Sequence, residues 1–162
     1  MTQTPSAPPG AIVVSRTVQA SAADVWAVLA DGWSYATFVV GTSRVRDVDE
    51  TWPAVGARIH HSFGLWPAVI DDTTVALESA PPHRLVLQAR GWPAGEARVA
   101  ITLTEESEGT CTVRVAEDAV KGPGTLIPKV VRQALIGPRN VETLKRLAYL
   151  AEGRGRSSVT AP

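Results

Sequence analysis

The chain has 162 residues with 16 basic and 16 acidic side chains, 44% hydrophobic residues and a mean hydropathy of +0.03. These values are typical of one soluble globular domain with a core that needs no disulfide. Zero formal charge and the lack of a long basic run argue against nucleic acid or an anionic membrane as the main partner, because both attract a basic face.

Cysteine content and the chain ends set the expected compartment and domain limits. The single Cys111 has no second cysteine and no closely spaced histidine, which excludes an intrachain disulfide and a zinc module. No apolar run approaches about 18 residues and the chain start lacks a signal-peptide pattern, so we expect a cytoplasmic protein with no membrane span. The composition of residues 1–10 and 153–162 predicts disordered ends around one domain over residues 11–152.

The first predicted elements are a strand and a short helix. β-Branched residues concentrate in residues 11–20 and predict a strand. Ser21 then supplies an N-cap hydroxyl with Asp24 three residues later, and the apolar spacing that follows predicts a helix over Ala22–Ala30. Residues 32–41 predict a second short helix or a loop that holds three aromatic side chains.

Six further stretches alternate apolar and polar residues and are separated by turns rich in Gly and Pro. This spacing predicts an antiparallel meander with one covered apolar face and one wet face. The expected strands are Thr42–Asp49, Ala57–Gly64, Ala68–Ala80, Arg84–Gly91, Gly95–Glu105 and Thr110–Ala119.

A long helical period follows near the C-terminus, between Leu126 and Glu152. Within it, Pro138 removes a backbone donor and clashes with the carbonyl of Ala134. We therefore expect a kink or a break after Gly137. The piece that follows is about 22 Å long, enough to cross several strands and cover their apolar face.

Four motifs stand out along this series of elements. They are Ser21–Asp31 (SAADVWAVLAD), Pro81–Leu87 (PPHRLVL), the strand Ala97–Thr104, and Gly122–Gly124 leading to Asn140–Leu147 (NVETLKRL). Together with the order of the elements, they resemble the START-like helix-grip superfamily, also called SRPBCC, and within it the bacterial polyketide cyclase/dehydrase branch. The resemblance covers Ile12 to Glu152 and rests on scaffold positions rather than on a catalytic signature.

The resemblance implies an α+β helix-grip fold, in which a curved seven-stranded antiparallel sheet wraps around a long C-terminal helix and two short helices follow the first strand. It also implies a largely apolar cavity between sheet and helix. We expect no metal and no other cofactor. The expected function is binding of a small hydrophobic molecule such as a polyketide, a lipid or an isoprenoid. The alternatives are a polyketide cyclase, aromatase or dehydratase that uses an inward His or Glu as acid and base, and a protein-interaction module.

Two titratable side chains are expected on the covered face of the sheet. Alternation places His61 with Phe63 on that face, and it also turns Glu117 inward on the last strand. His61 and Glu117 are therefore the catalytic candidates, unless a one-residue bulge reverses either strand. The plainer interpretations are a half-buried histidine bonded to a neighbour, and a carboxylate at the rim with solvent or Lys121 as its partner.

Metal binding and nucleophilic hydrolysis find no specific support in the sequence. His60 and His61 are adjacent strand residues whose side chains point to opposite faces, and His83 lies in a turn. The sequence has neither a Gly-x-Ser-x-Gly elbow nor a Gly-rich phosphate loop. We therefore predict no metal site.

Five of the nine aromatic residues are Trp, and three of these five precede Pro. Trp26 is expected in the core and Trp52 in a Pro-stiffened turn. Trp33, Trp66 and Trp92 are candidate walls or gates of the cavity, because large rigid side chains stack on ligand rings; packing across a turn is the alternative for the last two. The candidate ligand-binding residues are then Trp33, Tyr35, His61, Phe63, Trp66, Trp92 and Glu117.

Overall fold

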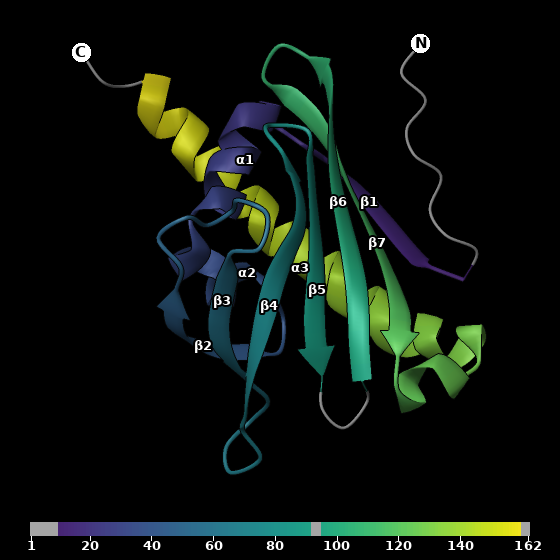
Figure 1. Cartoon of the computed structure of the whole chain (residues 1–162). Helices are drawn as coiled ribbons and strands as arrows, with labels where there is room; N and C mark the ends of the chain where they lie inside the picture. Colours follow the sequence, from purple (N-terminus) through teal and green to yellow (C-terminus); the bar gives the residue numbers. More distant parts are fainter. Residues whose placement is uncertain (1–9, 92–94, 160–162) are drawn as a thin grey trace.

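A curved antiparallel sheet forms the body of the structure, a computed structural model that describes residues 10–91 and 95–159 (Figure 1). Its strands are β1 (Ile12–Val18), β2 (Thr42–Val48), β3 (Arg58–Phe63), β4 (Ile70–Ala80), β5 (Arg84–Gly91), β6 (Gly95–Ser107) and β7 (Thr110–Lys121). They pair in the order β1-β7-β6-β5-β4-β3-β2, so the chain runs as a meander from β2 to β7 and β1 lies beside the last strand. The predicted helix-grip architecture is confirmed.

The longest helix lies behind the sheet in the view of Figure 1. The helical elements are α1 (Ala22–Ala30), η1 (Gly32–Ser34), α2 (Tyr35–Phe38), η2 (Pro123–Leu126) and α3 (Lys129–Val159). α3 packs against β1, α1 and α2. Within residues 10–91 and 95–159, no helix has the length and apolar content that crossing a membrane requires.

Helix α1 has the predicted bounds and the predicted start. Ser21 Oγ accepts a hydrogen bond from the Asp24 amide at 3.1 Å, and the Asp24 carboxylate accepts from the Ser21 amide at 3.3 Å. This capping box satisfies two amide groups that a helix N-terminus leaves without partners. The helix then buries Val25, Val28 and Leu29 in the core.

Helix α3 continues through Pro138, so the expected alternative of a break after Gly137 is wrong. A proline inside a helix costs about 3 kcal/mol because a hydrogen bond is lost and the preceding turn is crowded. Pro138 lies on the exposed side, and the turns beyond it bury Leu144 and Leu147. Burial of two leucine side chains contributes about 3–6 kcal/mol, which offsets the effect of the proline.

The same helix also extends past Glu152, where the sequence predicts the start of a disordered tail. Arg154 holds this extension against the C-terminal end of α1. Its guanidinium donates to Asp31 Oδ2 at 3.0 Å and to the Ala27 carbonyl at 3.4 Å. These contacts to α1 depend on tertiary structure, so the local composition of the tail does not reveal them.

Three rows of side chains cross β5, β6 and β7 on the covered face. The strand register gives them as Leu85–Ile101–Val115, Leu87–Val99–Glu117 and Ala89–Ala97–Ala119. The side chains become small in the third row, which leaves space above that part of the sheet. The alternation predicted for these strands is confirmed.

Bulges occur in the sheet, but not where they would reverse the faces of the candidate residues. β3 pairs with β4 without interruption over residues 58–63, and β7 pairs with β6 without interruption over residues 111–119. The irregular pairs fall within β2, within β4 and near the ends of the β6–β7 ladder. His61 and Glu117 therefore keep the face that alternation assigns to them.

Gly41 forms the turn that joins α2 to β2. Its φ of +100° lies in the left-handed region that residues with a Cβ rarely adopt. A Cβ at this position would also overlap the ring of Phe63 on the neighbouring strand. Glycine thus lets the turn lie directly against Phe63.

Candidate functional site

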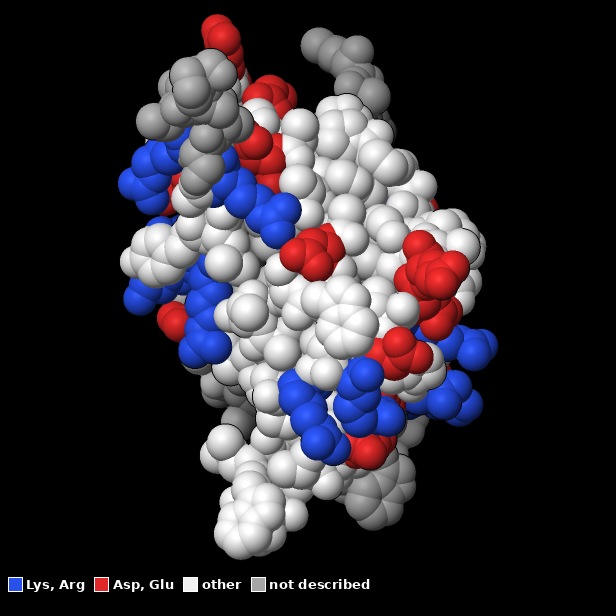
Figure 2. Space-filling view, turned by 90° about the vertical axis from the view of Figure 1, so that its left-hand side faces the viewer, with Lys and Arg blue, Asp and Glu red and all other residues white. Residues whose placement is uncertain are grey.

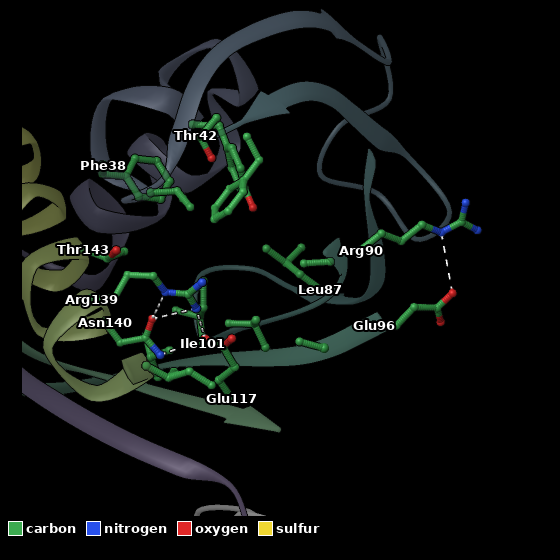
Figure 3. Close-up of a pocket in the computed structure, with 18 of the residues that line it drawn as sticks. Phe38, Thr42, Leu87, Arg90, Glu96, Ile101, Glu117, Arg139, Asn140 and Thr143 are labelled. Carbon is green, nitrogen blue, oxygen red and sulfur yellow. Dashed lines mark hydrogen bonds and ion pairs between the residues drawn. The ribbon is translucent and has the colours of Figure 1, made fainter. Parts of the chain in front are cut away.

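A cavity of about 470 Å³ lies between the sheet, α2 and α3 (Figure 3). The three rows of β5, β6 and β7 form its floor, and Tyr35 and Phe38 of α2 form one wall. Ile136, Leu144 and Leu147 of α3 cover it from the other side. Small-molecule sites typically measure about 300–1,000 Å³, so the cavity that the resemblance implies is present at a useful size.

The cavity has a closed end and a mouth. At the closed end its lining includes the buried side chains of Leu29, Trp52 and Leu147. Toward the end of β3 and the start of α3 the lining includes Phe63 and Leu135, which are exposed. A ligand would therefore enter between these two elements.

Charged side chains at the mouth pair with one another. Arg90 Nε lies 3.7 Å from Glu96 Oε1, and Lys121 Nζ lies 3.9 Å from the same oxygen. Gln88 donates to the other carboxylate oxygen at 2.5 Å. Arg90 and Glu96 lie across the cavity from Arg139 in Figure 3. The apolar floor therefore lies between two polar regions, one with Arg90 and Glu96 and the other with Arg139.

Three buried polar groups, one each on α2, β3 and β4, form a hydrogen-bonded chain beside one wall of the cavity. Thr74 Oγ1 lies 2.9 Å from His61 Nε2 and 3.2 Å from the Tyr35 hydroxyl. The rings of His61 and Tyr35 also contact each other, with centroids 5.3 Å apart. Burial raises the pKa of Tyr35, so its hydroxyl keeps its proton and can donate a hydrogen bond.

His61 lies in this chain as a neutral ring. Burial lowers the pKa of His61, the charge of Asp72 opposes that shift, and the charge of Arg46 adds to it. Among the described residues, His61 Nδ1 and Thr42 Oγ1 are buried without a hydrogen-bond partner, and both residues line the cavity. Such atoms are rare in proteins, so a polar ligand atom would gain most at this wall.

The lowered pKa of His61 makes stability depend on pH. The folded protein binds this proton less readily than the unfolded chain, so the free energy of unfolding falls as the pH drops below the ordinary histidine value of 6.5. We expect His61→Gln to flatten this fall, and His60→Gln, on the opposite face of β3, to retain it. Urea unfolding between about pH 7 and pH 5 measures both slopes. Equal slopes for His61→Gln and the parent protein would contradict the prediction.

Glu117 is buried and is held by two side chains of α3. Its Oε2 accepts hydrogen bonds from the Arg139 guanidinium and, at 2.9 Å, from Asn140 Nδ2. Arg139 Nε donates in turn to Asn140 Oδ1 at 3.3 Å, which closes a three-residue network (Figure 3). The expected rim position with solvent or Lys121 as partner is therefore wrong, because Lys121 pairs with Glu96. Glu117 stands in the middle row of the floor, where α3 supplies the compensating charge.

Arg139 and Asn140 line the cavity but are absent from the catalytic and ligand-binding candidates that the sequence predicts. The available signal was Asn140, which falls on the buried stripe of α3 between Ile136 and Leu144 at intervals of four residues. A polar residue on an apolar helical stripe indicates a buried hydrogen-bond partner elsewhere in the fold.

The tryptophans differ most from expectation. Trp33 and Trp66 are 60% and 88% exposed and do not line the cavity, because η1 and the β3–β4 loop turn them toward solvent. Trp92 lies outside the described residues. Trp52, expected to pack across a turn, is buried in the cavity lining and donates from Nε1 to the Leu29 carbonyl at 3.0 Å.

The structure gives the positions of the remaining aromatic and titratable candidates. Trp26 is partly buried against the core. The structure places Tyr35, His61, Phe63 and Glu117 in the cavity lining. Burial raises the pKa of the Cys111 thiol to about 11, so little of the nucleophilic thiolate forms at neutral pH.

Comparison with known proteins gives a consistent picture. A family model described as polyketide cyclase/dehydrase and lipid transport matches residues 10–152. Among curated proteins, no match is found.

Solved structures show the same fold. The aromatase/cyclase Zhui from Streptomyces sp. R1128 is 17% identical, with 89% of this chain and 94% of that chain covered and a TM-score of 0.68. A Rhodobacter sphaeroides protein is 20% identical over 91% of this chain and 98% of that chain, with a TM-score of 0.68. Norcoclaurine synthase from Thalictrum is 15% identical over 89% of this chain and 94% of that chain, with a TM-score of 0.63.

Proposed function

The chain belongs to the polyketide cyclase/dehydrase and lipid transport family, and we propose that it binds a small, largely apolar molecule that carries oxygen substituents. The cavity between sheet and α3 carries this proposal. Its floor is apolar except for Glu117, and polar groups stand at defined positions on its walls. Aromatase/cyclases with the same fold support a cyclic or polyketide-like ligand class.

Affinity and orientation come from different parts of the site. A ligand that buries about 200 Å² of apolar surface on the floor would gain about 5 kcal/mol. Tyr35 and Thr42 offer hydrogen-bonding groups on one wall, and the Arg139 guanidinium offers donors on the other. Glu117 compensates the charge of Arg139, so the site favours a neutral carbonyl or hydroxyl over a free carboxylate.

Native mass spectrometry of the purified protein tests the proposal, together with titration of the neutral fluorophore N-phenyl-1-naphthylamine. We expect saturable uptake at one site per chain, or a co-purified molecule that the fluorophore displaces. Failure to take up the fluorophore, combined with a ligand-free mass, would rule out the binding function.

Proton transfer next to a ligand carbonyl is a second candidate function, and the His61–Thr74–Tyr35 chain favours it. The Tyr35 hydroxyl would donate a hydrogen bond to the carbonyl oxygen. Neutral His61 would accept a proton from the adjacent carbon, forming an N–H bond as the C–H bond breaks, and the electron pair would move to the carbonyl oxygen to give an enolate. After the new N–H exchanges with solvent, His61 would return a proton to that carbon and restore the carbonyl. Positioned acid and base groups of this kind typically accelerate a reaction about 10²- to 10⁴-fold.

Exchange of the methyl protons of 2-acetylnaphthalene in deuterium oxide, followed by NMR, tests this second function. The parent protein is expected to accelerate the exchange, and His61→Gln to remove at least about 90% of the acceleration while fluorophore uptake persists. His60→Gln is the matched control. Equal exchange with and without the protein would leave the binding function and eliminate proton transfer.

A further inference from the structure

Large apolar side chains project from two segments at one end of the molecule. Leu65 and Trp66 form the tip of the β3–β4 loop, and Leu126 and Val130 lie on η2 and the first turn of α3. All four are more than 80% exposed, and we call them the apolar tips. Isolated exposed apolar residues are ordinary, but four so exposed at one end indicate a contact surface.

The apolar tips flank the mouth of the cavity. Both segments lie at the lower end of the molecule in Figure 1, and uncharged side chains make up the lower tip of the face in Figure 2, where the β3–β4 loop projects. Phe63 and Ile127, which line the cavity, each lie within two residues of a tip along the chain. A surface that contacts the tips would therefore also meet the mouth.

The charges around the mouth are arranged asymmetrically. The side chains of Arg90 and Lys121 are 63% and 74% exposed, and Lys129 is exposed between two of the apolar tips. Glu96, which pairs with both Arg90 and Lys121, is more covered, with its side chain 19% exposed. Asp118 pairs with Arg132, and this second pair is largely covered, with side chains 23% and 13% exposed. Asp71, whose side chain is 56% exposed, lines one hollow together with Arg90 and Lys121. Three exposed cations therefore outnumber this exposed carboxylate around the mouth, although the whole chain has zero formal charge.

We propose that this end of the molecule docks on the surface of an anionic lipid bilayer; the proposal rests on the binding function proposed above. Apolar tips beside exposed lysine and arginine suit a bilayer interface, where apolar groups enter the acyl region and the cations meet the headgroups. Docking would place the mouth against the membrane, so that an apolar ligand passes between bilayer and cavity without crossing water.

Sedimentation with vesicles of phosphatidylcholine and about one-third phosphatidylglycerol tests the docking. The parent protein is expected to bind and to lose affinity as salt rises. The substitutions Trp66→Gln and Val130→Gln are each expected to weaken binding about tenfold, because each removes one inserted apolar side chain. Val55→Gln is the matched control, because Val55 is exposed and lies before the opposite end of β3.

Binding of N-phenyl-1-naphthylamine without vesicles separates this proposal from the one on which it rests. Normal fluorophore uptake with no vesicle binding would overturn the docking and leave the binding function intact. Vesicle binding by a protein of ligand-free mass that does not take up the fluorophore would support the docking surface and remove the ligand-binding function. A dimer in sedimentation velocity that Trp66→Gln or Val130→Gln converts to a monomer would instead assign the apolar tips to a second copy of the chain and overturn membrane docking.

Discussion

Replacing Arg139 with methionine is expected to lower the free energy of unfolding by about 3 kcal/mol, because a buried carboxylate loses its compensating charge. Glu117 would remain in the cavity floor with Asn140 as its partner in the network. The expected value lies at the low end of the range for broken buried pairs, since about a third of the Arg139 side chain is exposed. Urea unfolding at pH 7 measures the change.

A second substitution and a surface control identify the cause. Glu117→Gln combined with Arg139→Met removes both charges and is expected to recover most of the lost stability, because a neutral amide is far less costly to bury. Arg146→Met breaks an exposed ion pair, in which Arg146 Nε lies 2.9 Å from Glu142 Oε1. This substitution is expected to change the free energy of unfolding by less than about 1 kcal/mol. An Arg139→Met effect no larger than the Arg146→Met effect would refute a buried ion pair.

The alternation of residues along the strands was sufficient to predict which side chains form the floor of the cavity. The period of two along β5, β6 and β7 decides which side chains share a face, and the uninterrupted pairing of β3 and β7 keeps His61 and Glu117 inward. The capping box at Ser21 likewise depends on neighbouring residues, which is why the bounds of α1 were predictable.

The partners of these side chains were not predictable in the same way. Whether Glu117 faces solvent or Arg139 depends on how α3 is rotated about its axis relative to β7, and that is set by packing across the whole domain. Trp33 and Trp66 show the converse case, because their aromatic character indicates contact but not whether it is with a cavity or with something outside the molecule. The burial of Trp52 could not be predicted without the position of its hydrogen-bond partner Leu29, which lies 23 residues earlier in the chain.

Filling the row of small residues in the floor should block ligand binding without unfolding the protein. Ala97 stands between Ala89 and Ala119 in the register, and all three line the cavity. A phenyl ring at position 97 would project over this row and occupy space that the ligand needs, while its own burial would be favourable. We therefore expect Ala97→Phe to weaken binding of N-phenyl-1-naphthylamine at least about tenfold, with stability unchanged within about 1 kcal/mol.

The adjacent residue supplies the control for this substitution. Arg98 is exposed on the other face of β6 and does not line the cavity. Arg98→Phe introduces the same ring on the same strand and is expected to leave fluorophore binding within about twofold of the parent. If Ala97→Phe binds the fluorophore as the parent does while remaining folded, the ligand does not lie over the alanine row. If both variants lose binding equally, the effect comes from disturbance of β6 rather than from occupied space, and the cavity floor is not the contact surface.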